Sequence, residues 1–269
     1  MLKRLILPAI LALCLSTGCG NAAESPRLTP VVKVVKKWGP SVVNISTERL
    51  AIIQHNLFQG MYGTAFEEFF RQNPAAMIPI GTMKLKGIGS GVIVSEDGLI
   101  VTNAHVVHMA NKIYVILADG KATEAEVFAV SPADDIAILK ITPPEELHAI
   151  KFAQDVMIGE TVVAIGNPFG LENSVSAGII SGTNRSFSAG QPGQMMTFNN
   201  LIQTDASINL GSSGGALFNL DGELVGINLA VVQGAQSIGF AIPASRIREI
   251  LEEYKEIKSK QPVRIKISE

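Results

Sequence analysis

Residues 211–218 read GSSGGALF and place a serine, Ser213, among glycines directly before a short apolar run. Glycines let the backbone approach a reacting group closely, and successive N–H groups can then point at one spot, as an oxyanion hole requires. A phosphate-binding loop would need a lysine and a following helix, and this stretch has neither. Taken alone the stretch favours a plain glycine turn between two strands, so a functional reading depends on the rest of the chain.

The chain around this stretch consists mainly of short apolar runs with strand character. We predict strands at 42–47, 91–94, 99–102, 113–117, 126–130, 136–141, 161–165, 174–181, 201–204, 216–219, 224–232 and 237–242. Turn signals such as Asp119-Gly120 and Asp221-Gly222 separate them. The sequence therefore predicts an all-β fold of barrels or sandwiches, with Pro143-Pro144 as the joint between two halves.

Helical periodicity is confined to two segments, 31–38 and 243–258. In both, apolar residues recur every three or four positions: Val31, Val34, Val35 and Trp38 in the first, and Ile247, Ile250, Leu251 and Tyr254 in the second. Pro40 ends the first helix, and Pro243 is expected in the first turn of the second.

Length and composition exclude several classes of protein. The chain has 269 residues, of which 47% are hydrophobic and 17% charged, and its formal net charge is −2. These values suit one large or two small globular domains and exclude a disordered chain. The near-neutral balance argues against nucleic acid as a partner.

The first residues have the pattern of a targeting segment. A positively charged start precedes an apolar run at 5–15 that is too short to span a bilayer. We expect a signal peptide at 1–22, and two routes remain open: cleavage after Ala22, or lipidation of Cys19 in a lipoprotein-like box. Both cysteines of the chain lie in this segment, so we expect no disulfide in the remainder.

A histidine and an aspartate stand in similar strand-end settings. His105 lies in VTNAHVV (101–107), and Asp135 lies in DDIAILK (134–140). Each alone is more often structural, but His105, Asp135 and Ser213 follow the chain order of the chymotrypsin-type triad. His and Asp fall in the first half and Ser in the second, as expected for a site between two barrels. The four histidines lack zinc-site spacing, so we expect no metal or cofactor.

Seven motifs in the same order give the chain a specific resemblance. They lie at 89–93, 102–107, 135–140, 166–171, 202–209, 211–217 and 239–243. On these motifs the chain resembles the HtrA/Deg family of envelope serine proteases over roughly residues 28–251. The resemblance implies two chymotrypsin-like six-stranded β-barrels with a C-terminal helix, and a serine endopeptidase that degrades misfolded or unfolded envelope proteins.

The resemblance also implies roles for the three residues. Ser213 would attack the scissile carbonyl, His105 would move the proton, and Asp135 would orient the imidazole. The backbone N–H groups of Gly211 and Ser213 would form the oxyanion hole.

The specificity pocket implied by the resemblance has aliphatic walls. Its expected residues are Ile208, Leu210, Ile227, Asn228 and Leu229. Because no acidic residue is among them, we expect cleavage after small aliphatic residues.

The resemblance divides the chain into segments. Residues 28–251 would form the protease domain, with barrel one at about 40–142 and barrel two at about 150–243. Residues 252–269 would be a helix end and tail with no PDZ domain.

The location implied by the resemblance is the periplasm or cell envelope, with membrane attachment if Cys19 is lipidated. The implied partners are unfolded polypeptides in protein quality control and stress response, and two further copies of the chain in a homotrimer.

Three segments are candidates for regulation or assembly. Residues 31–38 match the family's trimer contact, 184–198 match a sensor loop, and 49–86 match a loop that reaches a neighbouring subunit. For 49–86, a local helix at 65–71 folded onto its own barrel is an open alternative to a lid or subunit contact.

The chain departs from the family pattern beside the predicted nucleophile. Ser212 replaces the usual Asn, Leu210 stands where Pro or Arg is common, and Leu229 where Thr is common. These departures leave open a rival hypothesis, a chaperone or adaptor that keeps the fold with an inactive or conditionally assembled site.

Overall fold

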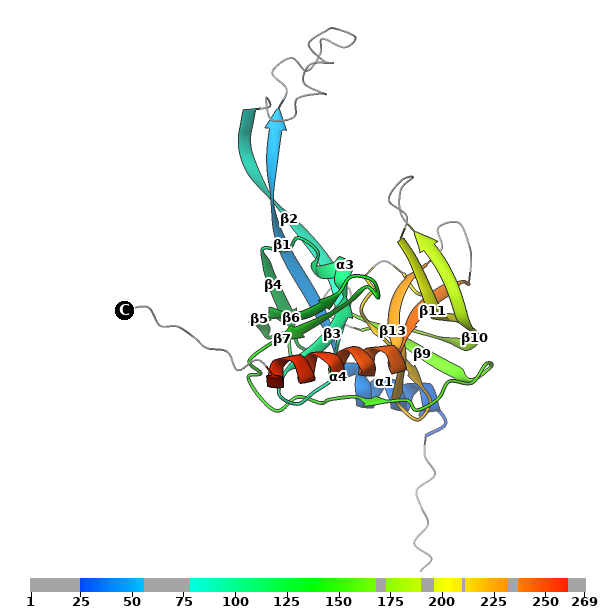
Figure 1. Cartoon of the computed structure of the whole chain (residues 1–269). Helices are drawn as coiled ribbons and strands as arrows, with labels where there is room; N and C mark the ends of the chain where they lie inside the picture. The colour runs from blue at the N-terminus through cyan, green and yellow to red at the C-terminus, as the bar shows by residue number, and fades with distance from the viewer. Residues whose placement is uncertain are drawn as a thin grey trace, which may run out of the picture.

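The computed structural model describes residues 25–55, 78–167, 173–189, 196–209, 211–231 and 237–260. Two curled, mainly antiparallel sheets stand side by side, and helices α1 and α4 both appear at the lower end of the pair (Figure 1). The all-β prediction with two halves is confirmed.

The first sheet contains the N-terminal strands. Its strands are β1 (Val42–His55), β2 (Ile78–Ile93), β3 (Leu99–Asn103), β4 (Lys112–Ile116), β5 (Ala122–Glu124), β6 (Glu126–Ser131) and β7 (Ile136–Lys140). They pair in the order β5-β4-β1-β2-β3-β7-β6. Only Ala125 separates β5 from β6, so one bent stretch of chain pairs with β4 at one edge and with β7 at the other. This stretch closes the sheet into a barrel of six effective strands, as expected.

The second sheet closes by a direct pairing. Its strands are β8 (Lys151–Phe152), β9 (Thr161–Gly166), β10 (Ser174–Ala189), β11 (Met196–Thr204), β12 (Ala216–Asn219), β13 (Glu223–Val231) and β14 (Gly239–Pro243). The order is β12-β9-β10-β11-β14-β13-β8, and β12 also pairs with β13. The pairing of β12 with β13 completes six strands, and β8 adds a short parallel strand beside β13.

Helices α1 and α4 pack against the strands of the barrels. In α1 (Pro30–Trp38) the hydroxyl of Thr29 caps the first turn by accepting from the Val32 N–H, and Trp38 stacks on Phe218 of β12 at 6.4 Å between ring centroids. A short 3-10 turn, Gly39–Ser41, then leads into β1. Helix α4 (Ala244–Lys260) starts one residue later than predicted, because Pro243 still belongs to β14 and pairs with Gly226.

The described ends of two segments predicted as loops are strands. β1 and β2 remain paired out to His55 and Ile78, so most of 49–55 and 78–86 is one long antiparallel ribbon, visible above the first barrel in Figure 1. The helix predicted at 65–71 lies outside the described residues. The described parts of 184–198, residues 184–189 and 196–198, likewise belong to β10 and β11, where Ser188 and Thr197 share a cross-strand hydrogen bond of 2.8 Å. Polar cross-strand pairs of this kind gave no apolar alternation in the sequence, which explains the error.

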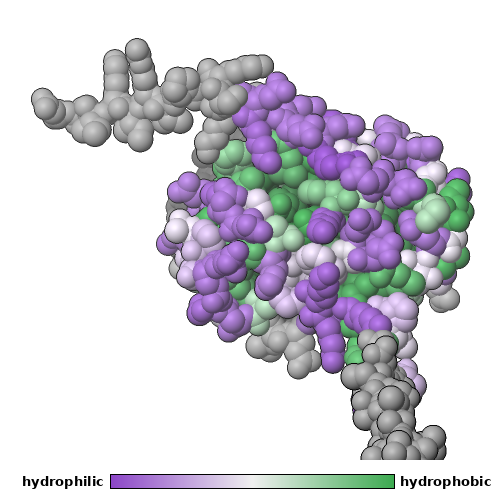
Figure 2. All heavy atoms as spheres, turned by 90° about the horizontal axis from the view of Figure 1, so that it is seen from below, coloured by the Kyte–Doolittle hydropathy of each residue, from purple (hydrophilic) through white to green (hydrophobic). Residues whose placement is uncertain are grey.

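A shared core holds the two barrels together. One cluster joins Val101 and Ile136 of the first barrel with Ile165 and Phe218 of the second and Ile247 of α4. Seen from below the view of Figure 1, hydrophilic side chains are interspersed with apolar patches on the surface (Figure 2). Within the described part of the chain, no helix combines the length and apolarity needed to cross a bilayer.

Candidate active site

The predicted histidine and aspartate form a pair in the first barrel. His105 lies on the short helix α3 (Ala104–Val107) directly after β3, and Asp135 precedes β7. Nδ1 of His105 lies 2.6 Å from Oδ2 of Asp135, and the backbone N–H of His105 donates to Oδ1 at 2.8 Å. The Asp135 side chain is 5% exposed and that of His105 is 51% exposed. A buried carboxylate that holds Nδ1–H leaves Nε2 of the neutral imidazole as an outward-facing acceptor.

The turn that carries Asp135 is strained and held by its neighbours. Asp135 has a φ of 53°, in the left-handed region that costs about 1 kcal/mol or more for a non-glycine residue. Its backbone carbonyl accepts hydrogen bonds from the Ala104 N–H at 3.0 Å and from Nδ2 of Asn103 at 3.1 Å. Such conformations persist where the surroundings over-determine them, and they concentrate at functional sites.

The glycine loop of the second barrel packs against β2 and β3 of the first barrel. The carbonyl of Ser213 accepts from the Ser90 N–H at 2.9 Å. Gly214 has a φ of 82°, and a Cβ there would collide with the carbonyl oxygen of Ser90 and the hydroxyl of Thr102. Only glycine therefore fits at position 214 between the barrels, close to Ser90 of β2 and Thr102 of β3.

The hydroxyl of Ser213 has a partner in its own barrel. It donates to the backbone carbonyl of Leu229 on β13 at 3.0 Å. A serine hydroxyl carries one proton. Ser213 must therefore release Leu229 before it can donate to the imidazole of His105.

Ser90 is a further buried group at this junction that the sequence reasoning missed. Its side-chain oxygen accepts from the Asn167 N–H at 2.8 Å and donates to the carbonyl of Gly211 at 2.7 Å. Its own carbonyl accepts from the hydroxyl of Thr102 at 2.7 Å. A serine inside a strand between two glycines was the one local signal, and its partners lie too far away in sequence to be inferred.

Three of the predicted pocket residues, Ile227, Asn228 and Leu229, lie on β13 beside Ser213, and Ile208 lies in the irregular stretch after β11. Ile208, Ile227 and Leu229 are buried. The buried Asn228 points Nδ2 at the carbonyl of Ala216 at 3.1 Å, so this amide ties β13 to β12. Leu210 lies outside the described residues.

An apolar hollow that the sequence did not predict lies beside His105. Its volume is about 460 Å³, and Val107, Met109, Val127 and Met196 are among its lining residues. Met109 is 65% exposed and Met196 is 48% exposed. The hollow offers an apolar surface next to the His–Asp pair.

A metal site is not evident in the part of the chain that the structure describes. No group of three or more His, Cys, Asp or Glu side chains there is arranged to hold a metal ion.

Two curled barrels with a His–Asp pair in one and a glycine-flanked serine in the other define the class of trypsin-like peptidases. A family model described as a trypsin-like peptidase domain matches residues 89–227. The chain belongs to the HtrA/Deg family within this class, as the sequence resemblance indicated.

Named relatives and a solved structure support this assignment. The putative serine protease HhoB of Synechocystis sp. is 40% identical over 237 residues, covering 86% of this chain and 54% of HhoB. The periplasmic serine endoprotease DegP of Escherichia coli is 36% identical over 267 residues, covering 90% of this chain and 55% of DegP. A structure of the HtrA-type protease AlgWS227A with a decapeptide is similar with a TM-score of 0.69 and 34% identity, covering 84% of this chain and 67% of that one. The chain thus spans about half the length of the curated relatives it matches.

Proposed function

We propose that the protein is a serine endopeptidase of the cell envelope that degrades unfolded or misfolded polypeptides with His105, Asp135 and Ser213. The observation that carries this proposal is the buried Asp135 carboxylate on Nδ1 of His105. Family membership supports the same chemistry.

The mechanism follows from these groups. The Ser213 hydroxyl turns from Leu229 to Nε2 of His105, which takes the proton as the oxygen attacks the scissile carbonyl. Asp135 stabilises the imidazolium, and the backbone N–H groups of Gly211 and Ser213 hold the oxyanion. The imidazolium then protonates the leaving amine, and water enters by the reverse sequence to release the acyl group and regenerate the Ser213 hydroxyl.

The substrate preference is for apolar side chains. Ile208, Ile227 and Leu229 are aliphatic, so a small aliphatic residue before the scissile bond fits best. The hollow beside His105 supports a second apolar contact with an extended chain.

The remaining proposals concern processing, location and assembly. The protein is exported through residues 1–22, or retained on the membrane through Cys19, and acts in the periplasm as its DegP relatives do by name. A protease domain at 28–251 assembles as a homotrimer. Because Val34 and Trp38 of α1 are buried in their own chain, α1 has its polar face left for contacts with another subunit.

A second candidate function is a chaperone or adaptor with a conditionally assembled site. The hydrogen bond from Ser213 to Leu229 favours it, because the hydroxyl is not directed at His105 in this arrangement. The wild-type activity of the assembled protein decides between the two functions.

Incubation of the mature protein and its Ser213→Ala variant with unfolded β-casein tests the proposal. We expect cleavage after Val, Ala or Ile by the wild type and none by the variant, read by mass spectrometry of the peptides. Absence of cleavage by both, together with suppressed casein aggregation, would instead support the chaperone function.

A further inference from the structure

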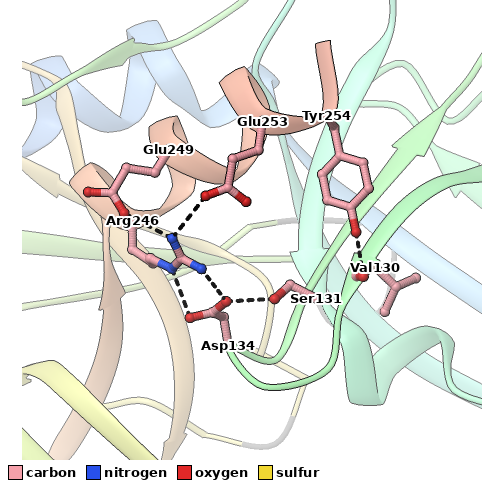
Figure 3. A network of polar contacts seen from close by, with 7 residues as sticks. All are labelled: Val130, Ser131, Asp134, Arg246, Glu249, Glu253 and Tyr254. Atoms are coloured by element: carbon pink, nitrogen blue, oxygen red, sulfur yellow. Dashed lines mark hydrogen bonds and ion pairs between the residues drawn. The ribbon is translucent and has the colours of Figure 1, made fainter. Parts of the chain in front are cut away.

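Helix α4 reaches from the second barrel to the loop that carries Asp135. Arg246, in the first turns of α4, donates from Nε to Oδ1 of Asp134 and from Nη2 to Oδ2, both at 2.9 Å (Figure 3). The Ser131 hydroxyl donates to the same Oδ2 at 2.6 Å. The planar guanidinium thus grips the carboxylate with two parallel hydrogen bonds, a geometry that fixes orientation as well as distance.

The guanidinium is itself held in place on α4. Nη1 of Arg246 donates to Glu249 at 2.9 Å and lies 3.6 Å from Glu253 (Figure 3). The hydrogen bonds that Arg246 donates to Asp134 lower the pKa of that carboxyl below its ordinary value, and the hydrogen bond from Ser131 contributes less. Asp134 is therefore ionised wherever the neighbouring His–Asp pair is expected to work.

A second contact ties α4 to the other end of the same loop. The Tyr254 hydroxyl donates to the carbonyl of Val130 at 2.8 Å (Figure 3). Helix α4 therefore holds the segment 130–134 at both ends. Beside the Arg246–Asp134 pair lies a cavity of about 270 Å³ between α4 and β11, so close packing does not fix Asp134 from that side.

The held residue is directly followed by Asp135 in its left-handed conformation. The backbone carbonyl of Asp135 accepts hydrogen bonds from Ala104 and Asn103 of the first barrel. The side chain of Asp134, the residue before it, is bound by Arg246 of α4. We propose that Arg246 and Asp134 are positioning residues, through which α4 of the second barrel sets the carboxylate of Asp135 against Nδ1 of His105. This inference rests on the proposed peptidase function and adds to it a link between the two barrels.

The test compares Arg246→Ala with Arg248→Ala, a matched control on the same helix whose guanidinium donates to Gln154 at 3.2 Å. For Arg246→Ala we expect kcat on a chromogenic peptide to fall about tenfold to hundredfold with KM within about twofold, because displacement of a reacting group affects the chemical step. Arg248→Ala should keep both constants. A kcat equal to wild type in a folded Arg246→Ala variant would overturn the proposal.

Two further measurements keep the test decisive. Asp134→Asn, nearly isosteric, should lower kcat by a similar factor, and the double variant with Arg246→Ala should lose no more than either single change. Additive losses would mean that the two residues act separately and would overturn the proposal. If Arg246→Ala fails to fold in thermal unfolding, Asp134→Asn alone carries the test.

A proton NMR measurement separates this inference from the proposed function. The Nδ1 proton of His105 shared with Asp135 should give a far-downfield signal that is present in wild type and Arg248→Ala, and weakened or lost in Arg246→Ala. That result in a wild type without peptidase activity would leave the positioning inference standing and the proposed function wrong. An unchanged signal in Arg246→Ala would overturn the inference even if the enzyme is active.

Discussion

In the first barrel His105 and Asp135 share a contact of 2.6 Å, whereas in the second barrel Ser213 donates its proton to Leu229 of the same barrel. The first pair is joined by strands β3 and β7, which are hydrogen-bonded along their lengths. Ser213 instead sits on a loop whose contacts to the first barrel depend on Ser90 and Gly214. The comparison teaches that the His–Asp pair is positioned by paired strands within one barrel, whereas the proposed nucleophile is positioned by a loop that contacts both barrels.

The largest expected effect on kcat comes from a change in the His–Asp pair of the first barrel. Asp135→Asn keeps the shape of the side chain but favours the wrong imidazole tautomer, so kcat should fall by about 10⁴-fold. Steady-state peptide cleavage measures this, with Asp119→Asn at an exposed ion pair with Lys121 as control. A loss smaller than about tenfold would show that the His–Asp pair is not the proton-moving unit of the site.

Gly214→Ala should displace the loop that carries Ser213. The new Cβ meets Ser90 and Thr102 and is placed at positive φ, so we expect a loss of about 3 kcal/mol or more in the free energy of unfolding. Gly120→Ala is the matched control, because Gly120 has a φ of 83° and nothing within 4 Å of its Cβ position. Urea unfolding should give about 1 kcal/mol for the control. Equal losses in the two variants would mean that the barrel contact at Gly214 is unimportant.

Ser90→Ala should loosen the same loop without a collision. The change leaves the Asn167 N–H and the Gly211 carbonyl without their partner, which costs about 1–3 kcal/mol of stability. It should also lower kcat, because Gly211 is a predicted oxyanion donor. Ser41→Ala is the control, since the buried Ser41 hydroxyl has no hydrogen-bond partner among the described residues. A greater loss of stability in the control would contradict this account.

The smallest effect concerns the link between the barrels at low pH. Because the pKa of Asp134 is lowered in the folded state, the carboxylate contributes stability above the ordinary carboxyl pKa and loses it as pH falls through the lowered value. Wild type should therefore exceed Asp134→Asn in melting temperature near neutral pH, and the difference should shrink below about pH 4. Thermal unfolding of both proteins across this pH range measures the difference in melting temperature. A difference that grows toward low pH would contradict the prediction.

Local patterns predicted most of the strands and both helices, but they missed β5, β8 and the outer parts of the β1–β2 and β10–β11 pairs. His105, Asp135 and Ser213 were predicted together from their chain order and the family resemblance, since each alone is more often structural, and the structure brings the first two into contact. The rest depends on partners that no local pattern connects: Ser90 and Gly211 are 121 residues apart, and Asp134 and Arg246 are 112 apart. The long ribbon of β1 and β2 was missed because backbone pairing extends it past the buried core.

The distance in sequence between Ser90 and Gly211 has a consequence for biosynthesis. Contacts between residues so far apart form late in folding, because chain closure must come first. The first barrel, with His105 and Asp135, is complete in sequence before β9 is synthesised. The loop of Ser213 can make its contacts with Ser90 only after the second barrel has been synthesised. Under the proposed function, a chain that is still folding therefore has no assembled catalytic site and cannot cleave neighbouring chains.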